Sequence, residues 1–147
     1  MTFGEEIENE IKEFINKIGN IHYHSDSNYG VEYLNNNFRF LGTKIDLSKE
    51  KNYVSYDFKK NNFLDMIKFF EFKDIKENIL ASNEIHYVGD GITNSELVFS
   101  GKEFFKLLEF LFVNVPEHHY FFDIEKKWCL LIATEGWIDY GEKSIEI

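Results

Sequence analysis

One stretch near the C-terminus, residues 118–141, restricts the fold more than any other part of the chain. It reads HHYFFDIEKKWCLLIATEGWIDYG and contains both tryptophans and the only cysteine. Its two apolar runs, Tyr120–Phe122 and Trp128–Ile132, are rich in aromatic and branched residues, which is typical of buried strands. The polar segment 123–127 and the later pair Glu135-Gly136 supply reversals of direction. We therefore predict three strands that fold back on one another at the centre of an antiparallel sheet.

The second of these strands has no polar residue between Trp128 and Ile132. A strand that is apolar on both faces is normally covered on both faces. We therefore expect it in the interior of the sheet. We also expect Trp128 and Leu130 to lie on opposite buried faces or layers of that strand.

Helical patterns are clearest in three other segments. The first begins with Thr2-Phe3-Gly4-Glu5, which has the form of a capping box, and continues with isoleucines at helical spacing as far as Ile18. A second capping box, Ser100-Gly101-Lys102-Glu103, precedes another apolar helical pattern that runs to Asn114. A third helix is expected near Phe63–Phe72. A helical turn is expected at 31–37, and short strands at 38–41, 44–47, 53–58, 84–88 and 96–99.

Length and composition agree with one globular domain over residues 1–147. A chain of 147 residues can bury roughly 70% of its unfolded surface. Aromatic residues form 18% of it, including 16 phenylalanines, which predicts a core packed with phenylalanine. The fold class we predict is α+β, with an antiparallel sheet packed against about three helices.

Charge and hydropathy restrict the partners. The formal net charge is −10, from 26 acidic and 16 basic residues. Such a surface repels phosphate backbones, so we expect no direct binding of nucleic acid, and it favours a basic protein partner. The chain has no apolar run of the roughly 18 residues that span a bilayer and no secretory leader pattern, so we expect a cytoplasmic protein without a membrane partner. The oligomeric state stays open.

No cofactor or metal motif is complete. His22 and His24 share one face of a short strand, but a zinc site needs further ligands that the sequence does not identify. His118 and His119 are adjacent, so their rings point to opposite faces and cannot chelate one metal together. Gly89-Asp90-Gly91 lacks the spacing of a phosphate-binding loop. We predict no cofactor and no metal.

Candidate binding residues cluster in the C-terminal strands. Exposed tryptophan and tyrosine are typical interface anchors, although aromatic side chains more often belong to a core. Asp123, Glu135 and Asp139 lie near strand ends, where paired carboxylates can also perform acid–base chemistry. The candidates for binding are His118, His119, Tyr120, Trp128, Glu135, Trp137 and Tyr140. No catalytic residue is assigned.

The last third of the chain resembles a family of small bacterial proteins of unknown function. The likeness lies in Tyr87-x-Gly89-Asp90, Pro116-x-His118-His119-Tyr120, Trp128-Cys129, Thr134-Glu135-Gly136 and Tyr140-Gly141. Proteins of that family are similar in size and acidity to the immunity proteins of bacterial polymorphic toxin systems. The resemblance implies a non-catalytic inhibitor that binds a toxin domain stoichiometrically. The resemblance implies no catalytic residues for this chain.

Three functions therefore remain as hypotheses. The first is a non-catalytic, cytosolic protein-binding module, an immunity-like inhibitor of a basic toxin domain. The second is a small-ligand or regulatory binding domain in which His118, Trp128 and Trp137 line a pocket. The third is an enzyme, for which neither a nucleophile–base pair nor a full metal-ligand set is present in the sequence pattern.

Overall fold

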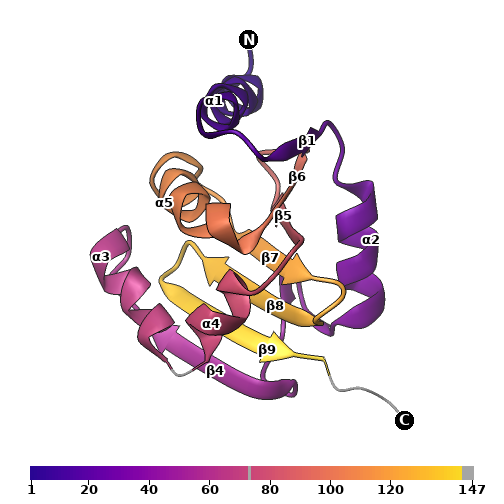
Figure 1. The fold of residues 1–147 in the computed structure, drawn as a ribbon, viewed down its shortest axis with the longest axis vertical. Coiled ribbons are helices and arrows are strands. Elements are labelled where there is room, and N and C mark those ends of the chain that lie inside the picture. The colour runs from indigo at the N-terminus through magenta and orange to yellow at the C-terminus, as the bar shows by residue number, and fades with distance from the viewer. Residues whose placement is uncertain (73, 144–147) are drawn as a thin grey trace.

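A seven-stranded antiparallel sheet forms the centre of the molecule in a computed structural model that describes residues 1–72 and 74–143 (Figure 1). The strands of this sheet are β1 (His22–His24), β4 (Lys51–Asp57), β5 (Ile85–Gly89), β6 (Glu96–Phe99), β7 (His119–Asp123), β8 (Trp128–Ala133) and β9 (Trp137–Glu142). Across the sheet they lie in the order β1-β6-β5-β7-β8-β9-β4. Two shorter strands, β2 (Phe40–Leu41) and β3 (Lys44–Ile45), pair with each other in a separate hairpin.

Helices cover both faces of the large sheet (Figure 1). Most of them lie on one face: α1 (Phe3–Ile18), α3 (Phe63–Met66), the 3₁₀ helix η1 (Ile67–Glu71), α4 (Ile75–Leu80), the 3₁₀ helix η2 (Gly101–Glu103) and α5 (Phe104–Asn114). The other face carries α2 (Asn28–Asn37) and the β2–β3 hairpin. These observations confirm the α+β class predicted from the sequence.

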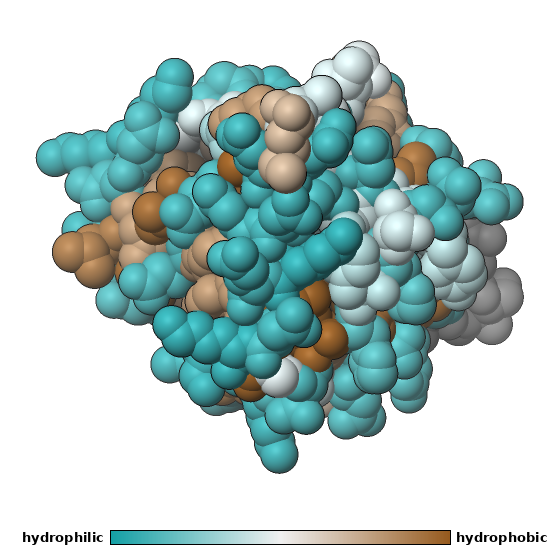
Figure 2. All heavy atoms as spheres, turned by 90° about the horizontal axis from the view of Figure 1, so that it is seen from above, coloured by the Kyte–Doolittle hydropathy of each residue, from teal (hydrophilic) through white to brown (hydrophobic). Residues whose placement is uncertain are grey.

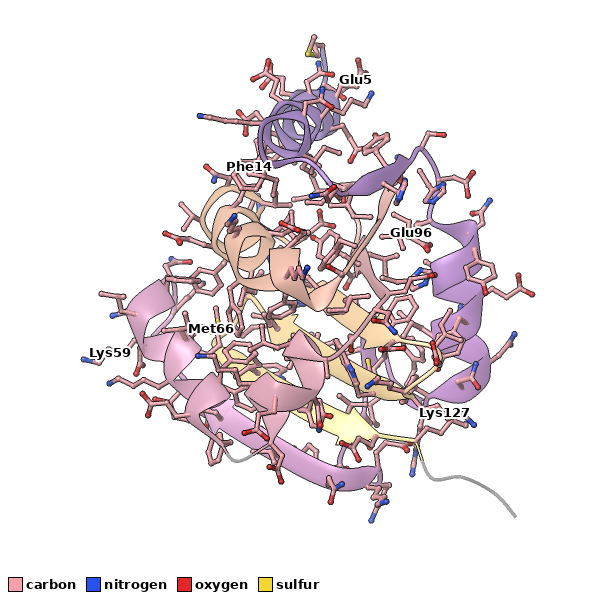
Figure 3. All side chains as sticks on the ribbon, viewed as in Figure 1. Glu5, Phe14, Lys59, Met66, Glu96 and Lys127 are labelled. Carbon is pink, nitrogen blue, oxygen red and sulfur yellow. The ribbon has the colours of Figure 1, made fainter. Side chains whose placement is uncertain are left out.

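The larger core fills the space between the sheet and the helices on the first face. Ile7, Ile11 and Ile15 of α1 are buried because their spacing of four residues puts them on one side of the helix. Phenylalanine is frequent in this core, as composition predicts, but isoleucine supplies more of its buried side chains. Phe14 of α1 stacks on Phe110 of α5 with ring centroids 4.2 Å apart. Figure 3 shows Phe14 between these two helices.

The interior strand β8 is buried along its whole length and divides two cores. Trp128, Leu130 and Ile132 belong to the larger core, whereas Cys129 and Leu131 belong to the smaller one under α2. The prediction that Trp128 and Leu130 occupy opposite faces was therefore wrong. Side chains alternate along a strand with a period of two, so residues two apart share a face.

The three C-terminal strands confirm the prediction made for residues 118–141. Strands β7, β8 and β9 are neighbours in the middle of the sheet and pair antiparallel. The Asp123 carboxylate accepts hydrogen bonds from the backbone N–H groups of Glu125 and Lys126, each at 3.0 Å, and so holds the first turn. Gly136, with φ +119°, makes the second turn, where a side chain would be strained.

Of the two capping boxes predicted from the sequence, the structure contains one. Thr2 caps α1, since its hydroxyl accepts a hydrogen bond from the N–H of Glu5 at 3.1 Å and also donates to the Glu5 carboxylate. Ser100 makes no such bond, and residues 101–103 form a 3₁₀ turn before α5 begins. The second predicted capping box was therefore wrong.

Two other segments differ from their predictions in length. The turn expected at 31–37 is part of a full helix, α2, and the helix expected near Phe63–Phe72 is a single α-helical turn followed by η1. None of the helices in the described ranges has the length and hydropathy needed to cross a bilayer.

Candidate functional site

The seven candidate residues from the C-terminal strands lie in three separate environments. His119, Trp128 and Tyr140 point into or line the larger core. Tyr120 lies in the smaller core under α2. His118, Glu135 and Trp137 reach one corner of the sheet, where β7 begins and β8 ends. The structure therefore does not bring the seven residues together into one site.

The three residues of the first group are held inside the protein. The indole Nε1–H of Trp128 donates a hydrogen bond to Ser82 Oγ at 3.0 Å, and the Tyr140 hydroxyl donates to Glu142 at 2.7 Å. His119 Nδ1 lies 2.7 Å from the Tyr87 hydroxyl. Burial lowers the pKa of His119 to about 3, so its ring is neutral near pH 7. These side chains organise the core.

The corner at His118 is a compact polar cluster. His118 Nδ1 accepts a hydrogen bond from the backbone N–H of Thr134 at 3.0 Å, and its Nε2 lies 3.3 Å from a Glu135 oxygen. Lys44 pairs with the same carboxylate and places its Nζ 4.8 Å from the centroid of the Trp137 ring. The hydrogen bond from Lys44 lowers the pKa of Glu135 below its usual value. Each charge in this cluster thus has a partner within the chain.

A second polar cluster, at the opposite edge of the sheet, lines a cavity of about 390 Å³. We call it the histidine–carboxylate cleft. Strands β1, β6 and β5 form its floor on the face that carries α2, and the start of α2 forms one wall. Its lining residues are His22, His24, Asp26, Tyr29, Glu84, His86, Glu96 and Val98.

His86 lies at the centre of this cleft, between two carboxylates. Its Nδ1 is 2.7 Å from Glu96, a residue only 3% exposed, and its Nε2 is 3.0 Å from Glu84. Burial alone lowers the pKa of His86, but the hydrogen bonds and negative charges of Glu96 and Glu84 outweigh it and raise that pKa above its usual value. Two carboxylates on the two ring nitrogens favour the imidazolium form, which donates from both.

Neighbouring elements fix this arrangement. The His86 ring stacks on Phe122 of β7, with centroids 5.3 Å apart and planes at 15°. The second oxygen of Glu96 accepts the backbone N–H of Gly30 in α2 at 2.8 Å. Figure 3 shows Glu96 on the side of the sheet that faces α2. Glu96 and His86 are thus held rigidly, whereas Glu84 is exposed and directly precedes β5.

Sequence reasoning found only part of this cleft. His22 and His24 were recognised as sharing one face, and both line the cleft from β1. Glu84, His86 and Glu96 were missed, although Glu84 and His86 stand two residues apart in a predicted strand and therefore share a face. The antiparallel pairing of β5 and β6 places Glu96 opposite Val88, two residues along from His86 and on the same face. That pairing was the signal available.

A further cavity, of about 300 Å³, lies beside Pro116 and His119, and aliphatic and aromatic side chains form much of its wall. The nearby Glu117 carboxylate already accepts hydrogen bonds from the N–H and hydroxyl of Thr93, at 3.2 and 2.8 Å. Within residues 1–72 and 74–143, no three histidine, cysteine or acidic side chains are arranged to hold a metal ion.

Comparison with models of protein families, with curated proteins and with solved structures gives no match for this chain.

Proposed function

We propose that the chain is a non-catalytic binding protein for a basic protein partner, and that an immunity-like inhibitor of a basic toxin domain is its specific form. The observation that carries this proposal is the shortage of internal partners for its acids. Across the described ranges, Lys44–Glu135 and Lys68–Asp65 are the ion pairs formed by lysine or arginine with a carboxylate. Among residues 1–72 and 74–143, the remaining exposed acids have no described lysine or arginine at ion-pair distance.

Helix α1 carries the densest group of these acids. Glu6, Glu10 and Glu13 are exposed there, and Lys12 of the same helix lies over the ring of Tyr23, 5.0 Å from its centroid. Figure 2, which looks onto the end of the molecule where α1 lies, shows a surface that is mainly hydrophilic. An uncompensated acidic surface accelerates encounter with a basic partner and disfavours acidic ones.

Aromatic anchors for such an interface lie outside the C-terminal strands. Trp128 and Tyr140 are buried, and Trp137 is half-buried beside Lys44. The exposed aromatic side chains include Tyr29, at 65% exposure, next to the histidine–carboxylate cleft. Tyr29 is therefore the better candidate for an anchor. Its large ring is exposed in the free protein, so a partner that covers it would bury additional surface.

Affinity capture with the purified chain as bait tests this function. The chain is coupled to resin, exposed to lysate of the source organism and eluted with salt, and the stoichiometry of any complex is measured by light scattering. We expect one basic protein in a fixed ratio. Changing Glu6, Glu10 and Glu13 to glutamine should reduce its recovery more than the same change at three exposed acids elsewhere, Glu71, Glu77 and Glu109. Recovery of no basic partner would refute the proposal.

The histidine–carboxylate cleft favours a second candidate, a small-ligand or regulatory binding domain. Its support is the cavity of about 390 Å³ with convergent polar groups, which is the usual form of a ligand site. The pocket of His118, Trp128 and Trp137 expected from the sequence differs, because Trp128 is buried in the larger core. Thermal-shift screening with small cationic and neutral compounds tests this candidate, and His86→Asn should abolish any response.

A further inference from the structure

The lining of the histidine–carboxylate cleft is acidic, and no lysine or arginine is among the described residues that form it. Asp26, Glu84 and Glu96 supply three carboxyl groups. The His86 ring, bonded to Glu84 and Glu96, provides positive charge that partly balances them, and this charge depends on pH. The cleft can therefore become more negative without any movement of its backbone.

The three carboxyl groups differ in how firmly they are held. Glu96 is buried and bonded on both oxygens, to Gly30 and to His86. The side chain of Glu84 is 64% exposed, and inside the cleft it contacts His86 Nε2 at 3.0 Å. An incoming cation can compete for Glu84 at little cost to the fold, whereas Glu96 keeps the imidazole in place.

We propose that the cleft receives an arginine side chain of the basic partner, whose guanidinium takes the Glu84 carboxylate from His86 while the His86 Nε2 proton leaves to solvent. This inference rests on the proposed function, because it assigns that partner its contact site. The proton passes from the ring to water, and no covalent bond other than N–H changes. His86 then stays as a neutral imidazole bonded to Glu96.

The chemistry of the cleft favours arginine over lysine. A guanidinium is planar and has five N–H donors, so it can bond more than one of the carboxyl groups that line the cleft, Glu84 and Asp26 among them. Tyr29 adds an exposed ring whose centroid is 6.0 Å from that of His86, and such a ring can stack on a guanidinium plane. A lysine ammonium makes point contacts and stacks less well.

Proton release gives the site a characteristic pH dependence. The groups that face His86 are Glu84 and Glu96, which contact it, with His22 and His24 from β1 and Asp26 and Tyr29 from the α2 side of the cleft. In the free protein the carboxylates hold the pKa of His86 above its usual value. A bound cation removes one carboxylate and adds positive charge, so that pKa falls. Affinity must therefore rise with pH between the two pKa values, by up to tenfold per unit.

The first test uses Nα-acetyl-arginine amide as the probe and follows the histidine ring signals by NMR. We expect saturable binding, in about the millimolar range for one side chain, with the largest change at the His86 ring. The affinity should rise at least threefold from pH 6 to pH 7.5. The uncharged analogue Nα-acetyl-citrulline amide should not bind, and the lysine amide should bind more weakly. No change at His86, or equal binding of the citrulline analogue, would overturn the proposal.

The second test compares Glu84→Gln with Glu109→Gln, which removes an equal charge from α5. Both acids are exposed, so both variants should fold. Glu84→Gln should weaken the arginine probe and the captured partner at least fivefold and remove the pH dependence, whereas Glu109→Gln should change affinity less than twofold. A basic partner that binds both variants alike would overturn the assignment of the cleft and leave the proposed function standing. Failure to capture a basic partner would instead remove the proposed function.

Discussion

The indole nitrogen of Trp128 and the hydroxyl of Ser82 are joined by a buried 3.0 Å hydrogen bond that ties β8 to the segment following α4. The same hydroxyl donates to the backbone oxygen of Asn78, 3.2 Å away, in the last turn of that helix. Ser82 therefore satisfies the one polar atom of a tryptophan that is 1% exposed. A tryptophan can lie this deep in the core because such a partner is present.

Removal of this hydroxyl should destabilise the protein. Ser82→Ala leaves the Trp128 N–H buried without an acceptor, and the desolvation of an unpaired donor costs roughly 1–3 kcal/mol. Denaturant melts followed by tryptophan fluorescence measure the change. Ser25→Ala, in an exposed loop, is the matched control and should shift the free energy of unfolding by less than about 0.5 kcal/mol. An equal effect of the two variants would contradict the role given to Ser82.

The interior position of β8 gives a second prediction. Leu130 is fully buried in the larger core, so Leu130→Ala should cost roughly 2–5 kcal/mol through lost burial and the cavity left behind. Leu64→Ala serves as control because Leu64 is 77% exposed, and it should cost less than about 0.5 kcal/mol. Urea melts of both variants provide the comparison. A loss below half a kcal/mol for Leu130→Ala would show that the strand is not a core element.

Sequence patterns identified elements whose signals are local. Helix α1 was predicted because its cap and its buried isoleucines are all written within residues 2–18. The strands β7, β8 and β9 follow one another through short turns, so their pairing also depends on neighbouring residues. Elements of this kind can be predicted from neighbouring residues alone, without knowing where the rest of the chain lies.

The histidine–carboxylate cleft could not be assembled from the sequence because its parts are distant along the chain. Gly30 and Glu96 are bonded although 66 residues separate them. Their contact requires that β1 pair with β6, which in turn depends on which strand forms the edge of the sheet. Alternation within a strand shows which face a residue occupies but does not identify the neighbouring strand. The same limit explains why the sequence pattern places Trp128 among the candidate binding residues although it belongs to the core.

Gly30 supports the cleft by its lack of a side chain. A Cβ there would lie 2.5 Å from a Glu96 oxygen and 3.0 Å from the Phe122 ring, both of which are packed in place. Helix propensity alone would make Gly30→Ala stabilising by roughly 0.5–1 kcal/mol. We expect the opposite sign, a loss of roughly 1–3 kcal/mol, because the overpacked site must shift. Thermal melts give the sign, and a stabilised variant would show that Glu96 moves freely.

The buried ring of His119 should make stability depend on pH. Its pKa is about 3 in the folded protein and near 6.5 when unfolded, so below pH 6.5 the unfolded chain takes up a proton that the folded protein does not. This contribution is therefore complete above pH 6.5 and is lost as pH falls toward 3. Between pH 7 and pH 5 the wild type should lose roughly 2 kcal/mol from this residue.

The variant His119→Gln isolates that contribution from the other titrating groups. It keeps a polar side chain near Tyr87 but cannot titrate, so its stability deficit relative to wild type should shrink by roughly 2 kcal/mol between pH 7 and pH 5. The raised pKa of His86 acts in the opposite direction, since its contribution is full at low pH and is lost as pH rises, but it is present in both proteins and cancels in the difference. A deficit that does not change with pH would mean that the ring titrates normally.

The last prediction concerns the rate at which the basic partner is bound. The uncompensated acids of α1 and the cleft should attract the basic partner over a distance, so salt should slow association. Raising the ionic strength from about 50 to 500 mM shortens the Debye length from roughly 14 to 4 Å. Dissociation should change much less, because it is set by close contacts such as those of Tyr29. Surface plasmon resonance with the captured partner measures both rates.

Tyr29→Ala should mainly speed release, whereas the glutamine variant at Glu6, Glu10 and Glu13 should slow association and flatten its dependence on salt. An association rate constant that does not depend on salt concentration would rule out electrostatic attraction as the means of recognition.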